Sequence, residues 1–209
     1  MKSLSLSKLT ILLFTGLFFT LVSCEQPKPN LPEKTKTDVE TDPMNDTVSV
    51  RGFTYAEFAS SIKLTDSQTV FLPQLWELWK AEKWTELEKI INQPGDTLNY
   101  GYPPANGFIN MELVTLPVGK TLDRYGYLGG SFVADEGASF GSRSLRTSSR
   151  NAPYYTFVVT KEIPDVSAGK SIPWFGEPGM GMQYNFADSI GTLVNLGYLK
   201  ITKNVPAKK

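Results

Sequence analysis

The sequence contains no histidine and only one cysteine among its 209 residues. Without histidine, the chain lacks the usual general base of serine and cysteine hydrolases and the commonest metal ligand of proteins. A single cysteine cannot form an internal disulfide, so carboxylates, amides and hydroxyls are the remaining metal ligands. These absences exclude a disulfide-rich fold, argue against a zinc enzyme, and lead us to expect no metal site.

Net charge is also absent, because 21 basic residues balance 21 acidic ones. A chain without a basic excess has no electrostatic footprint for nucleic acid, which we therefore do not expect as a partner. Hydrophobic residues make up 41% of the chain and aromatic residues 12%, which is enough to bury one good core. The composition predicts one folded domain with additional segments.

The first 23 residues have the pattern of a signal peptide. Lys2 and Lys8 precede an apolar run over residues 11–22 that is short for a membrane span. The run ends in Leu21-Val22-Ser23-Cys24, which resembles the lipobox of bacterial lipoproteins, where the cysteine becomes the first mature residue and carries lipid. We therefore expect residues 1–23 to be a lipoprotein signal peptide, and Cys24 to anchor the protein in the bacterial cell envelope. An ordinary secretory signal is the alternative.

Residues 24–50 are rich in proline, threonine and charge and have little to bury, so we expect a disordered tether. Residues 51–98 predict a helical lead-in. Capping-box patterns occur at Thr65–Gln68 and Thr85–Glu88, and Leu72, Leu75, Trp76 and Trp79 share a helical face. Tryptophans at this spacing usually belong to a core, which indicates a structural cap or spacer.

From residue 99 to 205 the sequence favours strands over helices. Glycine and proline punctuate short runs, and strands are expected at 111–115, 130–134, 157–160 and 199–202. A short helix is expected within 184–197. The prediction is an α+β fold in which an antiparallel or mixed β-sheet core follows a short helical N-terminal region.

Arginine, glutamine, glycine and aromatic residues gather in five islands of this domain, in an order that resembles the TNT family, named for the tuberculosis necrotizing toxin. The resemblance covers about half of the chain, roughly residues 100–203. The islands are 102–108, Leu122-Asp123-Arg124-Tyr125-Gly126 with the glycines at 129–130, Phe140–Arg143, 154–157, and Trp174-Phe175-Gly176 leading to Gln183-Tyr184.

The resemblance implies a hydrolase that cleaves the nicotinamide–ribose bond of NAD(P) and gives nicotinamide and ADP-ribose or its phosphate. NAD(P) is then the substrate, and no cofactor is expected. By the same resemblance, Arg124 and Arg143 hold the diphosphate, while Gln183 contacts the ribose and orients water or substrate. The family further implies a toxin role and an immunity protein as a partner.

The chemistry of this reaction suits a site without histidine. Nicotinamide leaves a pyridinium as a neutral molecule, so the leaving group needs no general acid. A diphosphate clamp is needed, and the planar fork of arginine suits phosphate oxygens. Tyr125, Phe132 and Phe140 are expected to line the substrate pocket. Glu177, six residues before Gln183, is a separate hypothesis: its carboxylate would stabilise the cationic ribose.

Each of these residues also has a structural interpretation. Arg124 beside Asp123 is compatible with a local ion pair that holds a turn, Arg143 with a solvated basic loop, and Gln183 with hydrogen bonds to nearby backbone groups. The aromatic residues are compatible with the core. Two other functions therefore stay open: a non-catalytic surface lipoprotein that binds a nucleotide or a protein, and an ADP-ribosyl transferase.

Overall fold

The computed structural model describes residues 48–208, which all belong to one compact unit. The predicted signal peptide, the lipidation site Cys24 and all but the last three residues of the predicted tether lie outside the described residues. No helix within 48–208 has the length and apolar character needed to cross a bilayer.

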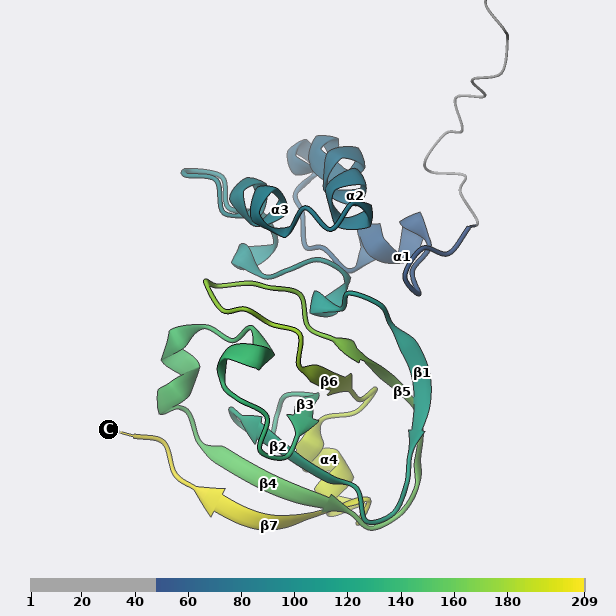
Figure 1. Cartoon of the computed structure of the whole chain (residues 1–209), viewed down its shortest axis with the longest axis vertical. Helices are drawn as coiled ribbons and strands as arrows, with labels where there is room; N and C mark the ends of the chain where they lie inside the picture. Colours follow the sequence, from purple (N-terminus) through teal and green to yellow (C-terminus); the bar gives the residue numbers. More distant parts are fainter. Residues whose placement is uncertain (1–47, 209) are drawn as a thin grey trace, which may run out of the picture. The chain divides into compact units, whose positions relative to one another are not determined.

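The centre of the fold is a seven-stranded sheet with the strand order β1-β5-β6-β3-β2-β4-β7. Every pairing between neighbouring strands is antiparallel, so the expected α+β class is confirmed and the sheet is antiparallel rather than mixed. Figure 1 shows the sheet curling, with α4 inside the curve. The strands are β1 (Glu112–Leu116), β2 (Thr121–Tyr125), β3 (Phe132–Asp135), β4 (Tyr154–Val159), β5 (Ile163–Lys170), β6 (Met182–Asn185) and β7 (Leu199–Val205).

Strands β1, β3, β4 and β7 fall where the sequence predicts them, whereas β2, β5 and β6 were not predicted. The missed strands carry residues that disfavour sheets, such as Asp123 in β2, Pro164 in β5 and Asn185 in β6. Pairing on both sides compensates for this: Asp123 is in register with Ala134 of β3 and with Thr156 of β4. Tertiary context therefore overrides local propensity where the candidate site residues lie.

Three helices precede the sheet, α1 (Tyr55–Ser60), α2 (Leu72–Lys80) and α3 (Trp84–Ile91), and α4 (Ile190–Asn195) follows β6. A capping box at Thr54 and Glu57 starts α1, and the predicted box at Thr65–Gln68 starts a 3-10 helix. The second predicted box, at Thr85–Glu88, is wrong. The N-cap of α3 is Lys83, without a side-chain cap, so Thr85 already lies inside the helix.

Two hydrophobic clusters stabilise the unit. One joins β-sheet residues such as Phe157 with Ile190 and Leu193 of α4. The other lies among the first three helices, which gather at one end of the sheet (Figure 1). There Trp76 and Trp79 stack with ring centroids 5.3 Å apart, which confirms their predicted place in the core.

Trp174 connects the helical cluster to the sheet region. Its ring is fully buried in the helical cluster although it follows β5 in the chain. The indole Nε1 donates a hydrogen bond to the Gly101 carbonyl at 2.9 Å, and the next amide, of Phe175, donates to Glu88 Oε1 on α3 at 2.8 Å. These contacts fix the position of the helices against the loop between β5 and β6.

Candidate active site

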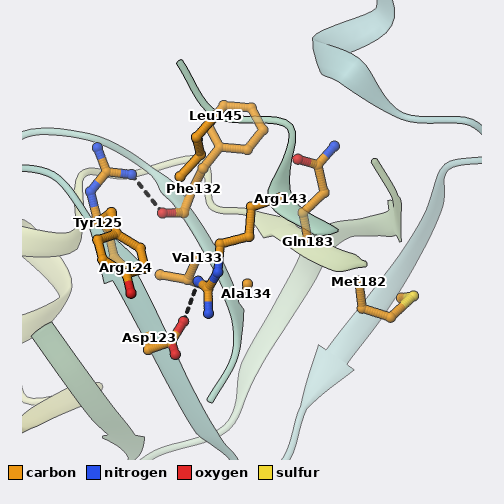
Figure 2. Close-up of a pocket in the computed structure, with 10 residues that line it drawn as sticks. All are labelled: Asp123, Arg124, Tyr125, Phe132, Val133, Ala134, Arg143, Leu145, Met182 and Gln183. Carbon is orange, nitrogen blue, oxygen red and sulfur yellow. Dashed lines mark hydrogen bonds and ion pairs between the residues drawn. The ribbon is translucent and has the colours of Figure 1, made fainter. Parts of the chain in front are cut away.

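Two adjoining cavities lie where β2, β3 and β6 meet the helical region. The smaller, called here the inner pocket, has a volume of about 40 Å³ and is lined by residues that include Asp123, Arg124 and Tyr125 (Figure 2). The larger, called here the cap cavity, has a volume of about 410 Å³. Four residues line both: Phe132, Arg143, Leu145 and Gln183.

The structure brings five of the predicted site residues together around the inner pocket. Arg124 and Tyr125 come from β2, Phe132 from β3, Arg143 from the loop after β3, and Gln183 from β6. Their convergence follows from sheet topology, because β2 and β6 both pair with β3.

Arg143 is buried in an ion pair with Asp123 rather than solvated, so the basic-loop alternative is wrong. Figure 2 shows its guanidinium extended toward the Asp123 carboxylate, which has no exposed surface. The other carboxylate oxygen accepts from the Tyr154 hydroxyl at 2.8 Å and from the Gly137 amide at 2.9 Å. Burial, followed by the hydrogen bond to this carboxylate, raises the pKa of Tyr154, so the phenol stays a donor. A buried charge is thereby fully paired.

Arg124 makes no ion pair with its neighbour Asp123, so that alternative is also wrong. Its Nη1 donates to the Phe132 carbonyl at 2.6 Å and its Nε to the Tyr127 carbonyl at 3.0 Å. Burial lowers the pKa of the guanidinium, as expected for a cation that faces carbonyls rather than a carboxylate. Arg124 is thus a cation held at the pocket by neutral acceptors.

Glycines make room for the Arg124 guanidinium. A Cβ atom added to Gly130 would lie 2.0 Å from Arg124 Nη2, and one added to Gly126 would lie 3.0 Å from the same atom. In contrast, a Cβ added to Gly129 meets nothing within 4 Å. The glycine pair after β2 therefore has unequal roles, and only Gly130 shapes the position of Arg124.

Gln183 stands at the junction of the two cavities. Its Nε2 donates to the Asn106 carbonyl at 3.4 Å, a long hydrogen bond near the limit of such contacts. The backbone of Gln183 is fixed between Ala134 of β3 and Gly169 of β5. A rigid backbone with a weakly engaged amide suits a side chain that contacts a ligand.

The predicted aromatic residues divide between the cavities and the core. Phe132 lines both cavities, whereas Phe140 is buried against Tyr125, with ring centroids 5.3 Å apart. The guanidinium of Arg150 lies 3.8 Å from the Phe140 ring. Phe140 therefore supports the Tyr125 ring from behind and is not part of the lining of the inner pocket or the cap cavity.

Glu177 lies outside both linings. Its carboxylate pairs with Arg150 at 3.4 Å, and its backbone forms a bridge with Trp174 that closes the loop before β6. Its proposed contact with the ribose stays a prediction.

The helical lead-in contributes to the site, which sequence reasoning missed when it assigned these residues a spacer role. Ser61 and Lys63, after α1, line the cap cavity with Tyr100 and Tyr102. The two tyrosines have 76% and 51% of their surface exposed. Tyr102 belongs to the segment 102–108 that carries the family resemblance, whereas the sequence signal for Tyr100 is its place in a loop beside Gly101.

Asn99 ties these segments together. Its Oδ1 accepts from the Lys63 amide at 2.8 Å, and its Nδ2 donates to the Tyr102 carbonyl at 3.0 Å and the Pro103 carbonyl at 3.3 Å. Its own amide donates to the Lys63 carbonyl at 3.1 Å. This buried side chain has its hydrogen-bonding capacity satisfied and fixes one wall of the cap cavity.

Left-handed backbone conformations concentrate around the cap cavity. Five of its non-glycine lining residues have φ between 46° and 56°: Asn99, Tyr100, Asn106, Ser144 and Phe175. Such conformations cost on the order of 1–3 kcal/mol each and cluster at ligand sites, although asparagine tolerates them better than other residues. The rest of the fold holds this wall in a shape that the local chain disfavours.

Within 48–208, no three carboxylate, thiol or imidazole groups are arranged to hold an ion. What the arrangement offers is two guanidinium groups, one amide and aromatic faces beside a cavity large enough for part of a dinucleotide.

The family model described as "Tuberculosis necrotizing toxin" matches residues 115–201. These residues form a TNT domain. The match runs from the end of β1 to the middle of β7 and includes Arg124, Arg143 and Gln183. Half of the residues that line the cap cavity precede the matched range.

A curated relative of the TNT-domain chain comes from Aspergillus fumigatus and is named conidial surface nicotinamide adenine dinucleotide glycohydrolase. The two are 41% identical over 128 residues, which is 54% of this chain and 54% of the relative. The chain thus spans about half the length of this relative.

Solved structures similar to the TNT-domain chain include the tuberculosis necrotizing toxin complexed with its immunity factor. That structure has a TM-score of 0.43 and 23% identity, and the similarity covers 48% of this chain and 60% of the toxin. The Rhs1 C-terminal toxin in complex with its cognate immunity protein has a TM-score of 0.37 and 16% identity, covering 50% of this chain and 86% of that one.

Proposed function

We propose that this chain is an NAD(P) glycohydrolase, which hydrolyses the nicotinamide–ribose bond to give nicotinamide and ADP-ribose or its phosphate. The observation that carries the proposal is the 41% identity, over 128 residues, to a protein named as an NAD glycohydrolase. The convergence of Arg124, Arg143 and Gln183 on one pocket supports it.

The reaction can proceed without a proton donor to the leaving group. Cleavage of the bond to C1′ returns an electron pair to the pyridinium nitrogen, so nicotinamide leaves as a neutral molecule. Water adds to the oxocarbenium-like C1′ and releases one proton to solvent. What remains for the protein is to position the ribose and the water. We assign this positioning to the Gln183 amide, and the proposed reaction uses no cofactor.

The two arginines differ in the number of N–H donors that are free to bind the diphosphate. Nε, Nη1 and Nη2 of Arg143 each donate within the protein, to Ala138 and Asp123, so at most two of its five N–H groups remain. Arg124 uses only Nε and Nη1, which leaves both hydrogens of Nη2. Because bidentate phosphate binding needs free, aligned donors, we assign the main contact with the diphosphate to Arg124.

Product analysis of the purified full-length chain tests this proposal. Incubation with NAD is expected to release nicotinamide and free ADP-ribose in equal amounts. Transfer of ADP-ribose to an added protein would indicate the transferase alternative. Binding of NAD without turnover would indicate a non-catalytic binding protein and overturn the proposed reaction.

Gly130→Ala is expected to reduce nicotinamide release about tenfold, whereas Gly129→Ala leaves it unchanged. The new methyl group at residue 130 displaces the Arg124 guanidinium, and lost charge-assisted hydrogen bonds cost about 1.5–3 kcal/mol. The displaced atom is the end of a flexible side chain, so we expect little change in thermal stability. Equal activity of the two variants would contradict the assigned role of Arg124.

We also propose that the protein is an exported lipoprotein with a toxin role, anchored through Cys24 and inhibited by an immunity protein. The pattern of residues 1–24 supports the anchor, and the name of the matching family supports the toxin role. Export would separate the domain from the NAD of the producing cell. Export would then protect the producing cell in addition to the immunity protein.

Cys24→Ala is expected to move the protein from the membrane fraction to the soluble fraction, because acyl chains each contribute about 0.8 kcal/mol per buried methylene. Deletion of residues 2–23 is expected to retain the protein in the cytoplasm and deplete cellular NAD. Fractionation with immunoblotting, together with a measurement of cellular NAD, checks both results. A Cys24→Ala protein that stays membrane-bound would refute the lipid anchor.

A further inference from the structure

The cap cavity is lined by cations and aromatic residues without a carboxylate. Its described lining includes Lys63 and Arg143 but no aspartate or glutamate. Arg143 is already neutralised by Asp123. Within residues 48–208, Lys63 takes part in no ion pair, so its ammonium is the uncompensated charge of this cavity.

A second cation without an ion-pair partner among the described residues stands at the rim. The guanidinium carbon of Arg146 lies 4.6 Å from the ring centroids of both Tyr102 and Phe175. Its Nη2 donates to the Tyr100 carbonyl at 2.6 Å. The contact with Arg146 holds the exposed Tyr102 ring in place, and exposed aromatic faces beside a cation are a common platform for a nucleic-acid base.

Lys63 is held where it can act on a ligand in the cap cavity. Both polar groups of its backbone are bound by Asn99, its amide at 2.8 Å and its carbonyl at 3.1 Å, while the residue itself is exposed. Gln183, at which we place the scissile bond, lines the same cavity. A dinucleotide cleaved at Gln183 would then place its adenosine half toward Tyr100, Tyr102 and Lys63.

Because the described lining of the cap cavity near Lys63 has no carboxylate, it favours one of the two dinucleotides. In Rossmann domains that bind NAD, an acidic side chain hydrogen-bonds the 2′-hydroxyl of the adenosine ribose, whereas in those that bind NADP a nearby arginine accommodates the 2′-phosphate. The same charge logic applies to a wall that has a lysine and no carboxylate. We propose that Lys63 binds the 2′-phosphate of NADP and makes NADP the preferred substrate. This inference rests on the proposed function and assigns a specificity-determining residue outside the range that matches the TNT family.

The test compares kcat/KM for NADP with that for NAD in the full-length protein and its variants. Lys63→Gln is expected to lower the ratio of the two values about tenfold, the usual effect of losing one charge-assisted hydrogen bond. Lys63→Arg should retain most of the preference. Lys89→Gln, which removes an exposed lysine of the same helical region outside the cavity lining, is expected to leave the ratio unchanged.

Added salt provides a second readout, since screening weakens a contact between exposed charges. The NADP preference of the natural protein should decrease as ionic strength rises, and that of Lys63→Gln should change little. A ratio in Lys63→Gln within twofold of the natural value would overturn the inference, as would an equal loss in Lys89→Gln.

The failure of this inference can be told apart from failure of the proposed function. If neither dinucleotide is hydrolysed, the proposed reaction is refuted, and calorimetric titration with NADP and NAD then measures binding directly. Weaker NADP binding in Lys63→Gln, relative to NAD, would still support the contact with the 2′-phosphate. Equal relative binding in the two proteins would overturn it.

Discussion

Gln183→Ala is expected to lower kcat for nicotinamide release by about 10²–10³, the usual effect of removing one positioned polar group from a reacting centre. The side chain reaches the junction of the two cavities from a backbone that is paired on both sides. Among residues 48–208, the Gln183 side chain makes a single hydrogen bond, the long one to Asn106. Few of the hydrogen-bonding groups of this amide therefore stabilise the fold. For this reason we expect the substitution to reduce catalysis rather than stability.

Two measurements check this expectation: the rate of nicotinamide release, from samples quenched at fixed times, and thermal unfolding of the variant. Since Gln183 lies at a partly open cavity, its truncation should change the free energy of unfolding by no more than about 0.5 kcal/mol. Gln74→Ala, which alters an exposed glutamine on α2, is the matched control and should retain full activity. Turnover within threefold of the natural value in Gln183→Ala would exclude the positioning role.

Asp123→Ala is expected to lower the free energy of unfolding by about 3–5 kcal/mol, because it leaves the buried Arg143 cation without its counter-ion. Both side chains are almost fully buried, and the same carboxylate accepts hydrogen bonds from Tyr154 and Gly137. For a folded unit of this size the loss corresponds to a fall of about 6–20 °C in melting temperature.

Urea denaturation of three variants separates this network from ordinary surface effects. Tyr154→Phe removes one donor to the carboxylate and should cost about 1–2 kcal/mol. Asp188→Ala, at an exposed aspartate before α4, should stay within about 0.5 kcal/mol of the natural protein. If Asp123→Ala were no more destabilising than Asp188→Ala, the ion pair would have no structural importance.

Local pattern revealed the parts of the fold that depend on local residues. The apolar runs of β4 and β7 and the tryptophan spacing of α2 are visible in the sequence, because burial of alternate or helically spaced side chains leaves a periodic trace. The pairing of Asp123 with Arg143 leaves no such trace. It joins residues 20 positions apart and allows a charged segment to form the interior strand β2, between β3 and β4.

The same reasoning explains what could be predicted of the site. Residue types, together with the family resemblance, pointed to Arg124, Arg143 and Gln183, which the sheet does bring together. The contribution of Lys63 and Asn99 depends on how the helical region packs against the loop before β6. Trp174 determines that packing. Neither hydrophobic periodicity nor a short motif predicts which hydrophobic cluster a single buried tryptophan will join.

The burial of Trp174 has a consequence for how this domain could be transferred between genes. The tryptophan falls within the segment that matches the family, yet most residues of the cluster that encloses its ring precede that segment. A gene segment cut at the family boundaries would also divide β1 and β7 and leave this ring in water. Recombination that moves this domain into another gene would therefore have to transfer the helices with it, so the unit of inheritance is longer than the segment that matches the family.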